Sequence, residues 1–167
     1  FQRRFRYRFR GTYEGRFMSD FDAKLDLKTI LQTEGQFVGT TAGVSMRPMI
    51  KSGRDVIVVK KKTEPLKKYD VALYTRGDAY VLHRVLEVFP DHYIIRGDNC
   101  YSDEYIPEEN VIGVLTEYFK GEKRILVTDK KYLRYVKRRI KFYPVRRFRV
   151  RVTSKIKRVV KKVLLRK

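Results

Sequence analysis

Between residues 36 and 119, short segments rich in β-branched and aromatic residues alternate with turns that contain glycine or proline. No apolar spacing of helical period competes with this pattern, so it predicts strands. We expect strands at residues 36–41, 55–60, 70–74, 80–89, 92–96, 111–118 and 124–127. Turns this short typically join antiparallel neighbours. The predicted fold class is therefore mainly β, an antiparallel β sandwich or partly open barrel.

An N-terminal helix is predicted over residues 18–35. Ser19 or Asp20 can cap its start, and Gly35 ends it because glycine tolerates the left-handed conformation that often follows a helix. The apolar face of this helix consists of Ala23, Leu27, Ile30 and Leu31.

Two basic helices are expected after residue 128. An Asp129 cap opens the first, and Pro144 breaks it because proline has no backbone N–H. Thr153 or Ser154 caps the second. The apolar positions of the two helices are Leu133, Val136 and Ile140, and then Ile156, Val159, Val160, Val163 and Leu164.

Charge divides the chain of 167 residues, whose net charge is +21. Residues 1–17 carry six arginines and one glutamate, residues 131–167 carry seventeen basic residues and no acidic one, and the part between has a net charge of −1. We therefore expect a leader at 1–17, the helix at 18–35, a catalytic domain at 36–128 and a basic helical tail at 129–167. The basic arms are expected to address a polyanion.

The leader is expected not to be native. The chain does not begin with methionine, and Met18 stands directly before the expected helix start. No function is assigned to residues 1–17.

Composition excludes several classes of site and location. One cysteine, Cys100, excludes an intramolecular disulfide, and no zinc-binding spacing occurs, so we expect neither a metal nor another cofactor. The longest aliphatic runs are four residues, too short for a transmembrane anchor. The expected location is peripheral on a membrane, on an undetermined side, or cytoplasmic.

Three motifs supply the parts of a hydroxyl nucleophile. Ser45 stands in a turn between Gly43 and Pro48, which restrict the backbone in ways that can leave a side chain exposed. His83 lies in a predicted strand, where a polar group is costly unless it has a partner. An acidic motif, Gly97-Asp98-Asn99, follows. Serine, histidine and an acid are the nucleophile, its base and the group that orients the base.

Five motifs in this order resemble the boxes of type I signal peptidases, whose wider clan includes the LexA-like self-cleaving repressors. The resemblance covers residues 36–119. A histidine base is similar to the endoplasmic-reticulum and archaeal branch. The motifs are Ser45-Met46-x-Pro48, Tyr69-Asp70-Val71-Ala72-Leu73-Tyr74, His83-Arg84-Val85, Gly97-Asp98-Asn99 and Val111-Ile112-Gly113.

The resemblance implies a role for each site residue. Ser45 is the nucleophile, and His83 is the general base that later protonates the leaving amine. The acid is expected at Asp103, with Glu104 as the alternative, while Asp98 is a further acid that suits a turn-stabilising role.

The sequence departs from the family pattern at the oxyanion site and at the anchor. Val44 replaces a hydroxyl residue that relatives carry before the nucleophile, so the oxyanion donors are expected to be the Ser45 N–H and a neighbour in the turn after Gly43. The missing anchor leaves room for a membrane-protein partner.

The leading hypothesis is a serine endopeptidase that cleaves a leader or signal peptide through an acyl-enzyme, after small residues. Residues 131–167 would bind an anionic membrane surface. The alternatives are a non-catalytic or self-cleaving LexA-like regulatory domain, and a basic membrane- or RNA-binding protein on an idle peptidase scaffold. Nucleic acid is the less favoured partner because an apolar stripe accompanies the charge.

Overall fold

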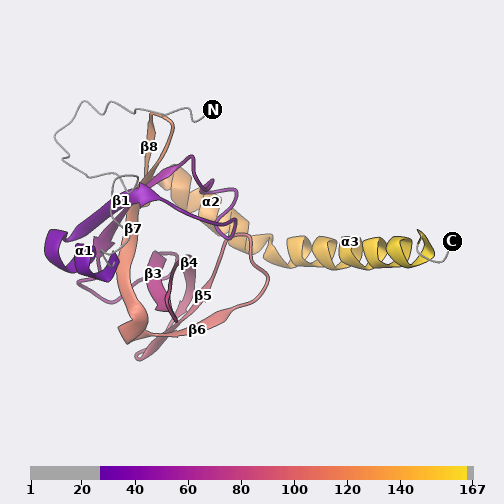
Figure 1. Ribbon diagram of the computed structural model, residues 1–167, viewed down its shortest axis with the longest axis horizontal. Helices are drawn as coiled ribbons and strands as arrows, with labels where there is room; N and C mark the ends of the chain where they lie inside the picture. The colour runs from indigo at the N-terminus through magenta and orange to yellow at the C-terminus, as the bar shows by residue number, and fades with distance from the viewer. Residues whose placement is uncertain (1–26, 165–167) are drawn as a thin grey trace.

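The computed structural model describes the backbone of residues 27–164, with side chains as far as Thr153 (Figure 1). The expected leader at 1–17 lies outside the described residues. So do Ser19, Asp20 and Ala23 of the predicted N-terminal helix.

Eight strands form one curled sheet with the shape of a half-barrel. All its pairings are antiparallel, so the mainly β prediction is confirmed. The spatial order is β1-β2-β7-β3-β4-β5-β6, and β8 pairs with β7. The strands are β1 Gln36–Thr40, β2 Val56–Lys61, β3 Val71–Arg76, β4 Ala79–Val88, β5 His92–Arg96, β6 Glu104–Pro107, β7 Val111–Lys120 and β8 Lys123–Leu126.

Strand β6 was not expected from the sequence. It has four residues, begins with a charged one and ends at Pro107, so it carries neither an alternating pattern nor a β-branched run. It pairs with β5, and Glu104 of β6 lies opposite Ile95 of β5. A short 3₁₀ helix, Glu108–Asn110, then leads into β7.

Three α-helices accompany the sheet: α1 Leu27–Glu34, α2 Lys130–Lys141 and α3 Tyr143–Leu164. Gly35 has a φ of 71° and ends α1 as predicted, and Asp129 occupies the N-cap position of α2. Figure 1 shows α3 extending away from the sheet.

The start of α3 differs from the prediction of a cap at Thr153 or Ser154. Pro144 separates two helices as expected, but it also stands in the first turn of α3, where its fixed φ suits a helix and its missing N–H costs nothing. Thr153 lies inside the helix, and its hydroxyl donates to the carbonyl of Arg149 at 3.0 Å. The predicted cap is therefore wrong.

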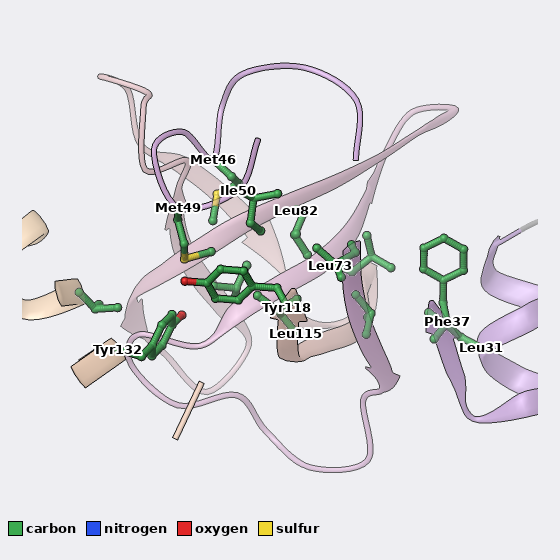
Figure 2. Packing of buried hydrophobic residues seen from close by; sticks show 14 residues of the cluster. Leu31, Phe37, Met46, Met49, Ile50, Leu73, Leu82, Leu115, Tyr118 and Tyr132 are labelled. Atoms are coloured by element: carbon green, nitrogen blue, oxygen red, sulfur yellow. The ribbon is translucent and has the colours of Figure 1, made fainter. Parts of the chain in front are cut away.

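The main core combines residues of the sheet and the serine turn with residues of helices α1 and α2. Leu31 of α1 and Tyr132 and Val136 of α2 are buried in it, whereas the predicted Leu133 is exposed. Figure 2 shows Met49, Tyr118 and Tyr132 at one end of this core, away from Leu31 and Phe37. Helix α2 thus belongs to the folded body.

A buried ion pair joins strand β4, at the residue that follows His83, to the Gly97-Asp98-Asn99 motif. Arg84 donates from Nε and Nη2 to the two carboxylate oxygens of Asp98, at 2.8 and 2.9 Å. Both side chains are almost fully buried. Burial opposes the charge on Arg84, but the Asp98 carboxylate outweighs it and raises the pKa of the guanidinium.

The remaining hydrogen-bonding groups of this pair bind three other segments. Arg84 also donates to the Tyr69 carbonyl, to the Tyr132 hydroxyl of α2 and to the Met49 sulfur, at 2.9–3.0 Å. The Asp98 carbonyl accepts from Arg139 of α2 at 2.9 Å. We call Arg84, Asp98 and these partners the arginine hub.

We predict that Asp98→Asn lowers the free energy of unfolding by about 3–5 kcal/mol, because it leaves the buried Arg84 charge uncompensated. Urea unfolding followed by circular dichroism measures the change. Asp103→Asn is the matched control: Asp103 pairs with Arg96 on the surface, where an ion pair contributes about 0–1 kcal/mol. Equal stability of the two variants would contradict this account of the hub.

Candidate active site

The turn that carries Ser45 is held from below by apolar side chains. Gly43 has a φ of 82°, a conformation that favours glycine, and the Arg47 N–H donates to the Val44 carbonyl at 3.1 Å. The side chains that follow the serine are buried in the main core, and they are Met46, Met49 and Ile50. Ser45 itself stays partly exposed at the rim of the cavity described below.

His83 lies in the middle of β4 and is buried. Successive side chains of a strand point to opposite faces, so His83 and Arg84 face opposite sides of the sheet. Arg84 enters the hub, and His83 turns toward the start of β6. Two adjacent residues therefore supply the candidate base and the arginine of the buried ion pair.

Glu104 is the carboxylate beside His83. Its Oε1 lies 3.1 Å from Nδ1 of the imidazole. The Tyr74 hydroxyl bridges the two groups: it donates to Glu104 Oε2 at 2.9 Å and lies 3.0 Å from His83 Nδ1. Arg76 donates to the same Oε2 at 3.1 Å.

Asp103, the acid first expected from the sequence, lies elsewhere. Its carboxylate accepts from Arg96 at 2.9 Å and is half exposed. Neighbouring residues point to opposite faces where β6 begins, so only one of the two acids can face His83. The structure gives that place to Glu104, the alternative, while Asp98 is occupied by the arginine hub.

The hydrogen bonds at Nδ1 determine where the imidazole proton resides. Burial and the Glu104 carboxylate raise the pKa of Tyr74, so its hydroxyl remains a donor. A carboxylate only accepts, so the neutral His83 carries its proton on Nδ1 and directs it to Glu104. This leaves the lone pair of Nε2 available as a base.

Gly97 allows Nε2 to approach the serine turn. A Cβ on Gly97 would lie 2.9 Å from His83 Nε2, 2.9 Å from the Ser45 carbonyl oxygen and 2.8 Å from Cys100 Sγ. Any larger residue here would separate the histidine from the serine turn. The Asn99 N–H also donates to the Ser45 carbonyl at 2.7 Å, which fixes the two loops to each other.

A cavity of about 1020 Å³ opens over these residues. Ser45, His83 and Glu104 line it together with Gly43. Apolar residues from α1 and the sheet, among them Ile30, Leu73 and Leu82, make up much of the remaining wall. A polar cluster at the edge of a mostly apolar cavity is typical of a binding site for a small molecule or an extended peptide.

Sequence reasoning missed three groups in this site: Tyr74, Arg76 and Cys100. Tyr74 follows from strand register, since β3 pairs Ala72 with His83 and so brings Tyr74 diagonally next to the histidine. Burial raises the pKa of the Cys100 thiol, which disfavours its thiolate form.

Among the side chains that the structure describes, no group of three or more His, Cys, Asp or Glu residues could hold a metal ion. No helix within residues 27–164 combines the length and apolarity needed to cross a membrane. No protein-family model matches the chain, and no curated protein matches it.

We predict that His83 titrates below the ordinary histidine value of about 6.5. Burial lowers its pKa most, the Glu104 charge raises it in part, and the Arg76 charge lowers it. Glu104→Gln should therefore lower the pKa further, and Arg76→Gln should raise it. Imidazole NMR signals measure this, and His92→Gln assigns the only other histidine. A His83 pKa above the ordinary value would contradict the geometry.

Proposed function

We propose that this protein is a serine endopeptidase with Ser45 as nucleophile, His83 as general base and Glu104 as the acid that orients the base. The observation that carries the proposal is the contact between Glu104 and Nδ1, which leaves Nε2 free beside the serine turn. A buried histidine with a purely structural role would have no need of a carboxylate on one side and an open cavity on the other.

In the proposed mechanism, His83 Nε2 takes the proton of the Ser45 hydroxyl as Oγ attacks the scissile carbonyl carbon. Glu104 stabilises the imidazolium that forms. The tetrahedral intermediate collapses when the C–N bond breaks and Nε2 gives its proton to the leaving amine. A water molecule, deprotonated by the same nitrogen, then hydrolyses the acyl ester and restores Ser45.

The oxyanion is assigned to backbone donors of the serine turn, the Ser45 N–H and a neighbour. Gly43 and Val44 cannot supply a side-chain donor. Loss of one donor in such a site costs about 10²–10³ in kcat, so we expect a slower enzyme than relatives with a hydroxyl before the nucleophile.

We further propose that the sheet is of the signal-peptidase and LexA-like type, and that the substrate is a leader or signal peptide with small residues before the cut. Ordered motifs support this, because the serine, histidine and Gly97 motifs all contribute residues to one cavity, whose wall also includes residues of the two edge strands, β1 and β6. An extended substrate would lie along the apolar wall. A membrane-protein partner would bring the substrate to the site.

The second candidate function, an idle scaffold, is separated from this one by a cleavage assay. A mixed peptide library is incubated with the full chain, and new termini are identified by mass spectrometry. Ser45→Ala and His83→Ala should each lower kcat by about 10⁴–10⁶-fold without unfolding the protein. Cleavage that survives undiminished in either variant would contradict the proposal.

The identity of the acid gives a second prediction with a matched control. Glu104→Gln should lower kcat by about 10³–10⁴-fold, because a neutral amide no longer stabilises the imidazolium. Asp103→Asn, one residue away, should leave the rate nearly unchanged. The reverse order of the two effects would assign the acid to Asp103 instead.

The pH profile should follow the same base. Only the neutral imidazole can accept the serine proton, so kcat/KM should rise with pH through a pKa below about 6.5. Because the Arg76 charge lowers the pKa of His83, Arg76→Gln should move this limb to higher pH. A profile that still climbs above about pH 9 would point to a lysine-like base.

A further inference from the structure

Helix α3 begins against the candidate site and then leaves the folded body. The Tyr143 hydroxyl donates to the Tyr101 carbonyl at 2.9 Å, and Arg146 donates to the Asp98 carbonyl at 3.1 Å. Beyond this first turn the helix backbone continues to Leu164, away from the sheet (Figure 1). Its root is fixed, and most of its length has no support from the domain.

An apolar stripe runs along the described part of this helix. Val145, Phe148 and Val152 recur at intervals of three and four residues, so they share one side of the helix. They are exposed by 55%, 68% and 37%. The sequence continues the same spacing at Ile156, Val159 and Val163 within the same helix.

The other positions of the helix are strongly basic. Arg147, Arg149 and Arg151 lie between the stripe residues in sequence and are exposed. Residues 131–167 contain seventeen lysines and arginines and no acidic residue. Long basic side chains beside an exposed apolar stripe are the composition of helices that lie in an anionic membrane interface.

Charge also argues against the two other occupants of such a stripe. A second copy of α3 would bring basic residues against basic residues on both sides of the seam, with no acidic residue to pair them. A nucleic acid would satisfy the charge, but its phosphate backbone gives no reason for a continuous apolar stripe.

We propose that α3 binds the surface of anionic phospholipid membranes, with the stripe from Val145 to Val163 in the acyl boundary and its basic residues at the headgroups. This inference stands on the helix alone and does not depend on catalysis. Because the root of α3 holds residues 98–101, a docked helix would keep the mouth of the candidate site close to the membrane surface.

The test uses the full chain and co-sedimentation with vesicles of equimolar phosphatidylglycerol and phosphatidylcholine. Val152→Asp should weaken binding about tenfold or more, since an apolar side chain that the membrane would bury is lost and a charge enters the acyl boundary. Val150→Asp is the matched control, because Val150 has a similar exposure of 40% and lies on the opposite side of the helix. Its binding should stay close to that of the parent chain.

Both aspartates change the net charge equally, so equal losses in the two variants would show electrostatic attraction alone and overturn the proposal. Strong sedimentation with pure phosphatidylcholine would overturn the requirement for anionic lipid. Phe148→Ser removes apolar surface without altering charge and should also weaken binding.

A monomer–dimer shift in analytical ultracentrifugation that Val152→Asp abolishes would assign the stripe to a second copy. If Val152→Asp kept its vesicle binding but lost RNA binding, the stripe would be assigned to nucleic acid.

Discussion

The ion pair between Arg84 and Asp98 is the interaction on which the arrangement of this protein depends. It joins the strand that holds His83, the loop that follows Gly97, the serine turn through Met49 and helix α2 through Tyr132. A buried pair of charges stabilises only when every remaining donor and acceptor is satisfied, and here three other segments satisfy them. The same constraint that holds the fold together therefore brings the candidate catalytic groups into one cavity.

Much of the sheet was predictable, because β-branched segments between turns leave few alternatives to antiparallel strands. Ser45 and His83 also came from sequence, and the structure brings both to one cavity. Tyr74 could have been found: the Gly77–Asp78 turn fixes the pairing of Ala72 with His83, and register does the rest. The choice of Glu104 over Asp103 could not, because it depends on where the unpatterned strand β6 begins and hence on which face each acid takes.

The start of helix α3 could not be predicted from the sequence, for a different reason. Its sequence predicts a helix break at Pro144, yet a proline that ends one helix can start the next, so α3 runs from Tyr143 through the residues expected to cap it. The consequence is functional. Arg139 and Arg146 donate hydrogen bonds to the Asp98 carbonyl within the folded body. The basic residues farther along α3 are left to interact with a membrane surface. One stretch of positive charge thus has a structural part and an exposed part.

The most direct measurement of the central claim is the position of a covalent adduct left by a serine-directed acylating probe. Peptide mass spectrometry should find the label on Ser45 of the folded protein, at a rate that rises as His83 loses its proton, and no label after unfolding in urea. The thiol of Cys100 lies in the same cavity and is the natural internal competitor. Label on Cys100 instead of Ser45, or equal labelling of the folded and unfolded chains, would contradict the claim that His83 and Glu104 activate this serine.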